Sequence, residues 1–116
     1  RPATANVICS QAGCQPQKVH WDYDPAHVAS RKRGVPKPAS VILGLQEGCR
    51  LIVFDELVGG EVLVVVPPGC MLVFDGDVAH AGAWYACSNV RVHMYLDVDG
   101  IDRTVNHTWF PRKYGY

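Results

Sequence analysis

Two histidines, one aspartate and one arginine form an ordered set of residues that could hold a metal ion and an acidic ligand. His20 and Asp22 stand two positions apart, and His80 and Arg91 follow much later in the chain. Two histidines and one carboxylate are the ligands of the facial triad that binds non-haem Fe(II) and leaves coordination positions open. Arginine offers a planar fork of donors that matches a carboxylate. The sequence therefore predicts a metal centre with an anion-binding group beyond it.

The spacing of the first two residues suits a metal site built on a β-strand. Side chains two positions apart on a strand point to the same face, so His20 and Asp22 project together and Trp21 projects the other way. His80 follows an apolar strand and the acidic turn 75–77, which can bring it back against the first strand. Alone, a histidine in an apolar setting is more often a hydrogen-bonded core residue. His20 and Asp22, which precede it in the sequence, favour the interpretation of His80 as a metal ligand.

A second polar face is predicted on the last long strand. Arg91, His93 and Tyr95 share one face by the same alternation, and the opposite face is apolar. An unpaired charge facing a core costs several kcal/mol, so an inward Arg91 indicates a buried anionic ligand. The alternative is that this face points outward and Arg91 is solvated. Asn6 and Gln17 are further candidates for hydrogen bonds to such a ligand, and Asn89 is expected to serve the turn before the strand.

These residues need a rolled sheet to bring them together. The sequence predicts about eight short strands separated by turn residues, which is typical of an all-β jelly roll. The expected strands span 4–10, 18–23, 40–46, 50–57, 61–66, 70–74, 81–85 and 90–98. No convincing amphipathic helix is found. Residues after Gly100 are expected to form a surface tail.

One segment departs from this pattern of short strands and turns. The stretch from Asp24 to Pro38 contains three prolines and the basic run Arg31-Lys32-Arg33, and it is too long for a simple hairpin. Long loops in compact domains are often lids or binding loops, although a solvated basic loop is equally compatible with this composition. The basic run hints at an anionic substrate or a nucleic-acid backbone.

Composition limits the alternatives. With 116 residues, 48% of them hydrophobic, the chain is long enough for one globular domain over 1–116, which could be an excised catalytic core. The formal net charge is zero, which argues against a strongly electrostatic binder of nucleic acid or membranes. No signal peptide is visible and the five cysteines are an odd number without metal-type spacing, so an intracellular protein with reduced thiols is favoured.

Taken together, these residues resemble the Fe(II)- and 2-oxoglutarate-dependent dioxygenases. The match consists of the HxD pattern at His20-Trp21-Asp22, a distal His80 and Arg91. The stretch 68–82 is similar to the segment that leads to the distal histidine of this family, and 89–95 is similar to its co-substrate strand. The resemblance extends from about Asn6 to Val98.

The resemblance implies a double-stranded β-helix, a variant of the jelly roll. His20, Asp22 and His80 would bind Fe(II), and Arg91 would pair with the distal carboxylate of 2-oxoglutarate, with Asn6, Gln17 and His93 as further co-substrate contacts. The reaction would consume O2, release succinate and CO2, and hydroxylate or oxidatively demethylate a substrate. That substrate could be a protein side chain, a nucleobase or a metabolite. Many members carry N-terminal helices against the larger sheet, and this sequence has almost nothing before its first strand.

Two other classes of protein fit parts of the pattern. A cupin-type metal protein shares the jelly roll but usually supplies two closely spaced histidines and a glutamate, whereas no HxH is present here. A non-enzymatic jelly-roll module for sugar or protein would make the polar residues incidental, with Trp84, Tyr85 and Trp109 as an aromatic platform. An oxygenase that binds without turnover is also conceivable, but no ligand position is substituted.

Overall fold

The fold is nearly all β. The computed structural model describes residues 2–101, 103 and 108–110. Along the chain it contains β1 (Pro2–Ser10), α1 (Pro25–Ala29), β2 (Ala39–Gly44), β3 (Arg50–Asp55), β4 (Gly60–Val65), β5 (Met71–Asp75), β6 (His80–Gly82) and β7 (Asn89–Leu96). Within the described residues, no helix is long and apolar enough to cross a membrane.

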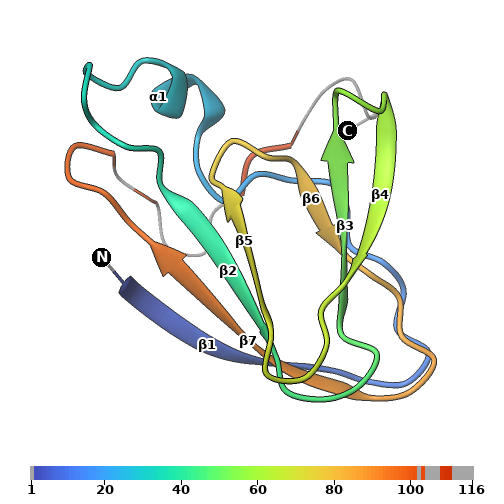
Figure 1. Cartoon of the computed structure of the whole chain (residues 1–116). Helices are drawn as coiled ribbons and strands as arrows, with labels where there is room; N and C mark the ends of the chain where they lie inside the picture. The colour runs from blue at the N-terminus through green and yellow to red at the C-terminus, as the bar shows by residue number, and fades with distance from the viewer. Residues whose placement is uncertain (1, 102, 104–107, 111–116) are drawn as a thin grey trace.

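Two antiparallel sheets face each other in a jelly-roll arrangement (Figure 1). The first has the order β1-β7-β2-β5 and the second the order β4-β3-β6. Most neighbours in these sheets are distant in sequence, as when β7 inserts between β1 and β2. The predicted all-β jelly roll is therefore confirmed, and the last long strand lies in the middle of the larger sheet.

The predicted strand at 18–23 is reduced to two isolated bridges. His20 pairs with His80, and the next residue, Trp21, pairs with Trp109 instead. Because successive residues turn to different partners, no continuous ladder forms. His20 nevertheless lies beside β6, so this segment occupies the place of a further strand at the edge of the second sheet.

Apolar residues between the sheets form the main core. A cluster of buried side chains joins the two sheets and comprises Ile42, Cys49, Leu51, Val66 and Phe74. Several polar residues are buried with them: Asp22, Ser40, His80, Asn89 and Arg91. The five cysteines are all free. The interior of this small domain therefore contains five buried polar or charged side chains as well as its apolar core.

The segment between Asp24 and Pro38 is not only a loop. It begins with the five-residue helix α1, which the sequence analysis did not predict. The side chain of Asp24 accepts a hydrogen bond from the backbone N–H of Ala26, and Pro25 occupies the first turn, as is usual at a helix start. Arg31 donates to the backbone oxygens of Val28 and Val35, so one cation of the basic run stabilises the segment itself.

The expectation of a surface tail after Gly100 is wrong for part of that region. Ile101 is buried against Tyr23 and Val28, and Trp109 forms a backbone bridge with Trp21. Both contacts depend on the folded arrangement and leave no local pattern in the sequence. Asp102, Asn106 and Pro111, also assigned to this tail, lie outside the described residues.

Gly44 allows two chain segments to cross closely at the end of β2. A Cβ atom at this position would lie 2.6 Å from the backbone oxygens of both Val66 and Pro67. We expect Gly44→Ala to lower the free energy of unfolding by about 1–3 kcal/mol, because backbone atoms would have to move. Urea unfolding followed by circular dichroism measures this change.

Gly60→Ala provides the matched control. Gly60 also lies in a strand, but a Cβ atom there would meet no atom within 4 Å. Its free energy of unfolding should change by less than about 0.5 kcal/mol or rise slightly. Equal effects of the two substitutions would show that the close approach at Gly44 does not constrain the fold.

Candidate metal centre

His20, Asp22 and His80 converge on one point between the sheets. One ligand atom from each residue lies within 4.8 Å of the others. Nε2 of His80 lies 3.2 Å from Oδ2 of Asp22, and Nε2 of His20 lies 3.6 Å from Oδ1. The backbone bridge between the two histidines has N–O distances of 2.9 and 3.0 Å. The structure therefore brings together the three residues that the sequence placed in a triad.

The outer nitrogen of each triad histidine is held by a backbone carbonyl. Nδ1 of His20 lies 2.8 Å from the oxygen of Lys18, and Nδ1 of His80 lies 3.1 Å from the oxygen of Val78. A carbonyl can only accept, so each Nδ1 carries the proton when the ring is neutral. Each Nε2 then presents its lone pair to the site, which is the usual arrangement for a metal-binding histidine.

Asp22 is fixed by a side chain that the sequence analysis missed. The hydroxyl of the buried Ser40 donates to Oδ2 of Asp22 over 3.1 Å. Burial alone would raise the pKa of Asp22, but its interactions with the neighbouring histidines His80, His93 and His20 lower the pKa to about 2. Burial and the neighbouring His80 lower the pKa of His20. Both shifts favour the forms that bind a metal, a carboxylate and a neutral imidazole.

The triad lies in a cavity of about 210 Å3 that also contains other predicted residues. Its lining residues are Ile8, Gln17, His20, Asp22, Ile42, Leu51, His80, Gly82, Arg91, His93, Tyr95 and Thr108. Arg91, His93 and Tyr95 line it together, so this face of β7 points inward as predicted. Ile8 and Ile42 come from the strands on either side of β7, and Leu51 comes from β3 in the facing sheet.

Arg91 is buried and faces the cavity without a carboxylate partner among the contacts described for it. It is only 6% exposed. Its Nη1 donates to the hydroxyl of Ser10 over 3.0 Å, and its guanidinium lies 4.9 Å from the ring centre of Tyr85. A hydroxyl and a ring leave much of the guanidinium charge uncompensated, so an anion entering the cavity would be stabilised.

His93 has the least satisfied polar atom of the site. Its Nε2 is buried and has no hydrogen-bond partner among the described residues, although Oδ2 of Asp22 lies 3.6 Å away. Burial lowers the pKa of His93 to about 4 despite the opposing effect of Asp22. The neutral ring can donate or accept one hydrogen bond, which a ligand in the cavity would supply.

Of the other residues that the sequence analysis singled out, some line the cavity and others do not. Gln17 lines the cavity, but its Oε1 already accepts from the backbone N–H of Gly82. Asn6 lies opposite His93 in the sheet, yet it is exposed and is not among the lining residues. Asn89 begins β7 and donates to the backbone oxygen of Glu47, between β2 and β3, so its expected role in the turn before β7 stays a prediction. Tyr85 is buried, which rules it out as part of an exposed aromatic platform.

Comparison with known proteins relates the chain to a hydroxylase structure. No protein-family model matches the sequence, and no curated protein matches it. Among the solved structures that match is a crystal structure of a Pseudomonas putida prolyl-4-hydroxylase, with a TM-score of 0.58 and 20% sequence identity. The match covers 79% of this chain and 50% of the hydroxylase chain, so this chain spans half the length of that protein. At this identity the similarity establishes a shared fold.

The hydrogen bond from Ser40 gives a test of the site that needs no turnover. We expect Ser40→Ala to weaken binding of Co(II), a spectroscopic substitute for Fe(II), by about 10-fold, because Asp22 loses the group that fixes its carboxylate. Absorption titration of the purified protein measures this affinity. Ser88→Ala is the control, since Ser88 is exposed and does not line the cavity. Equal affinities of the two variants would contradict a role for Ser40.

Proposed function

We propose that this chain is the catalytic core of an Fe(II)- and 2-oxoglutarate-dependent oxygenase. The observation that carries the proposal is the presence of the triad and of the buried, uncompensated Arg91 in one cavity. A triad alone would fit several metal proteins. Arg91 adds a cation to the same cavity, and this favours an anionic ligand that extends to the metal. The shared fold with a hydroxylase supports the proposal.

The donor set fits Fe(II). His20 and His80 supply two imidazole nitrogens and Asp22 one carboxylate oxygen, a combination that suits Fe(II) and leaves positions for other ligands. When bound, the iron would activate O2 for oxidative decarboxylation of 2-oxoglutarate to succinate and CO2, coupled to hydroxylation of a substrate. The protein's own part is to orient both histidines, so that each Nε2 faces the site, through the carbonyls of Lys18 and Val78.

The spacing of Arg91 and His93 suits a short dicarboxylate. Arg91 and His93 are two positions apart on β7, which corresponds to about 6.6 Å along a strand. This is comparable to the separation of the two carboxyl groups in a five-carbon diacid. Arg91 would bind the distal carboxylate, and His93 beside Asp22 would donate a hydrogen bond near the metal-binding end. Ile8, Ile42 and Leu51 would exclude water from the carbon chain.

Iron and co-substrate binding give the first test. Anaerobic addition of Fe(II) and then 2-oxoglutarate should produce a visible metal-to-ligand charge-transfer band, because the 2-oxo acid end binds the metal directly. The band should need both additions and should be lost in His80→Ala. His27→Ala is the control, since His27 belongs to α1 and does not line the cavity.

The result separates the possible classes of protein. A band that depends on both additions and on His80 would establish metal, co-substrate and triad together. Metal binding without any response to 2-oxoglutarate would indicate a cupin-type site. Failure of the folded chain to bind metal would leave a binding module, and either of these last results would contradict the proposal.

Arg91 gives an independent test of the co-substrate. We expect Arg91→Ala to weaken 2-oxoglutarate binding by at least about 30-fold, since loss of one partner of a buried charge pair costs about 2 kcal/mol or more. Titration of the charge-transfer band with 2-oxoglutarate gives the affinity, and Arg33→Ala, in the exposed loop, is the control. Fe(II) affinity should stay within about threefold, because Arg91 is not one of the three converging ligands. An unchanged 2-oxoglutarate affinity would refute this role of Arg91.

A further inference from the structure

His93 is a third imidazole beside the carboxylate of Asp22. Its Nε2 lies 3.6 Å from Oδ2 of Asp22, and Nε2 of His20 lies at the same distance from Oδ1. His93 belongs to β7 in the larger sheet, whereas His20 and His80 pair with each other at the edge of the second sheet. The carboxylate of Asp22 therefore has imidazole nitrogens from both sheets around it.

The Nε2 atom of His93 is available to a ligand. Among the described residues, two buried side-chain nitrogen or oxygen atoms have no hydrogen-bond partner, and the other, Oδ1 of Asn89, belongs to a residue that does not line the metal cavity. The 3.6 Å between His93 and Asp22 is too long for a hydrogen bond. Buried polar groups are nearly always paired, because an unpaired one costs free energy. The unpaired nitrogen of His93 therefore indicates a partner that binds in the metal cavity.

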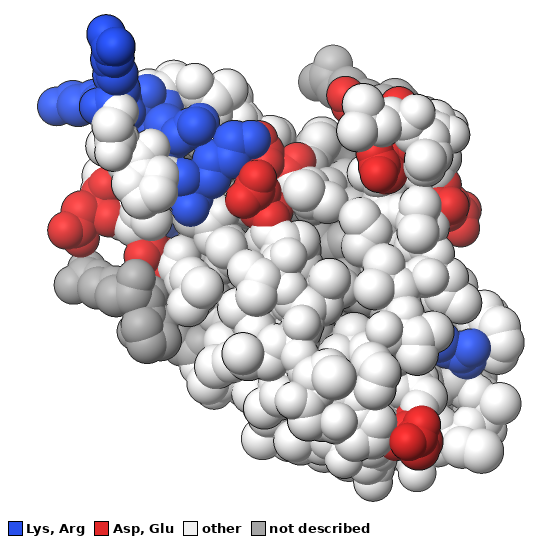
Figure 2. All heavy atoms as spheres, viewed as in Figure 1, with Lys and Arg blue, Asp and Glu red and all other residues white. Residues whose placement is uncertain are grey.

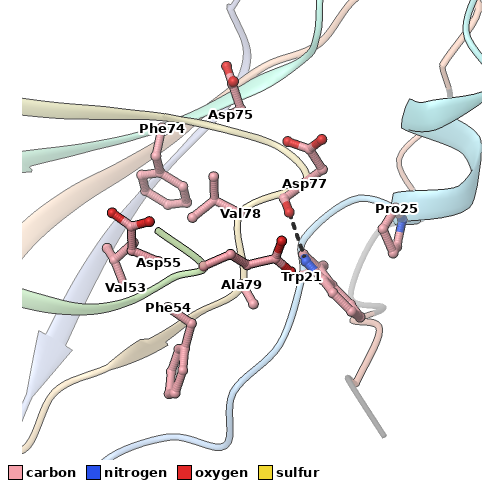
Figure 3. Close-up of a pocket in the computed structure, with 11 residues that line it drawn as sticks. Trp21, Pro25, Val53, Phe54, Asp55, Phe74, Asp75, Asp77, Val78 and Ala79 are labelled. Atoms are coloured by element: carbon pink, nitrogen blue, oxygen red, sulfur yellow. Dashed lines mark hydrogen bonds between the residues drawn. The ribbon is translucent and has the colours of Figure 1, made fainter. Parts of the chain in front are cut away.

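The ring of His80, in contrast, is packed against the wall of a second cavity. This cavity has a volume of about 540 Å3 and is lined by Trp21 and Phe74 (Figure 3). The indole N–H of Trp21 donates to the backbone oxygen of Asp77 over 3.0 Å, and the ring of Phe74 packs edge-on against His80, with centroids 4.7 Å apart. Packing and a backbone carbonyl thus fix His80, whereas no hydrogen bond described for His93 fixes its ring.

Three acids that line the second cavity are paired within the chain. Nζ of Lys37 lies 2.8 Å from Oδ2 of Asp77 and 3.9 Å from Oδ2 of Asp75. Asp55 accepts a hydrogen bond from the backbone N–H of Leu57. Figure 2 shows basic and acidic atoms next to one another in the α1 region. The unsatisfied nitrogen therefore distinguishes the metal cavity from the second cavity, where no described side chain has such an atom.

His93 can reach a metal ion at the triad by a small movement of its side chain. The ligand atoms of His20, Asp22 and His80 lie within 4.8 Å of one another, and His93 is outside this group. Adjacent ligands of an octahedral ion with bonds of about 2.1 Å lie about 3 Å apart, so the 3.6 Å between His93 and Asp22 is only slightly too long. Strand β7 holds the backbone of His93, and the cavity of about 210 Å3 gives the ring space to turn.

We propose that His93 is a fourth protein ligand of the metal, bound only while the co-substrate is absent. Imidazole suits iron, and His93 stands beside the carboxylate that holds the ion. That 2-oxoglutarate displaces His93 rests on the proposed oxygenase function, because a co-substrate extending from Arg91 to the metal passes along the same face of β7. Metal binding by His93 does not depend on that function. His93 would thus fill one coordination position until the co-substrate arrives.

The test counts the histidines bound to Co(II) in the purified chain. In the proton NMR spectrum of a high-spin Co(II) protein, each bound imidazole gives one strongly shifted ring N–H resonance, which disappears in D2O. The chain without 2-oxoglutarate should give three such resonances, and His93→Ala should give two. His27→Ala is the matched control and should give three, because His27 belongs to α1 and does not line the metal cavity.

Two further measurements use the same samples. His93→Ala should bind Co(II) about 10-fold more weakly than His27→Ala, because the ion loses one ligand. Saturating 2-oxoglutarate should leave the unaltered chain with two resonances, the missing one being the resonance that His93→Ala lacks. Circular dichroism establishes that each variant is folded.

The outcomes separate metal binding by His93 from the oxygenase function. Two resonances from the unaltered chain without 2-oxoglutarate, or equal Co(II) affinities of the two folded variants, would overturn the proposal. Three resonances that persist at 2-oxoglutarate concentrations sufficient to saturate the charge-transfer band would refute the displacement. Three resonances without any charge-transfer band would support His93 as a ligand while rejecting the oxygenase function, and two resonances with the band would do the opposite.

Discussion

The backbone bridge between His20 and His80 is the contact on which the site depends. It joins a segment without regular secondary structure to the edge of β6, and its two hydrogen bonds fix the relative position of two residues far apart in the chain. A shift of this pairing by one residue would turn one histidine to the opposite face of the sheet. The same bridge places Asp22 against His80 and Trp21 toward the neighbouring cavity. One register thus determines both cavities.

Burial of the polar side chains around the metal centre lowers the free energy of unfolding, unless a bound ligand pairs with them. Asp22 and Arg91 are both buried and of opposite sign, yet neither is described as the other's ion-pair partner. Each relies on neutral or weakly basic neighbours, and His93 leaves one buried nitrogen unsatisfied. Replacing these groups by apolar residues would usually stabilise such a core. Their presence in the core, where they line a cavity, is the physical basis for inferring a function there.

Strand alternation could be predicted from the sequence, whereas contacts between distant segments could not. The shared face of His20 and Asp22, and that of Arg91 and His93, are consequences of a period of two. Ser40 was missed because one hydroxyl in an apolar strand has no distinctive spacing. Helix α1 was missed because five residues are too few to show a helical period. Trp109 could not be placed near Trp21 without the fold, since nothing local to either residue requires that bridge.

The two cavities differ in how firmly their residues are held, and this difference fits a division of roles. Arg91 and His93 stand on the central strand β7, and both triad histidines are tied to backbone carbonyls. Rigid positions of this kind suit chemistry, which tolerates only small errors in geometry. The carboxylates that line the second cavity, next to Trp21, stand instead at strand ends and in turns, where substitutions are best tolerated. Substitutions around this second cavity should therefore leave the residues that would hold the metal undisturbed.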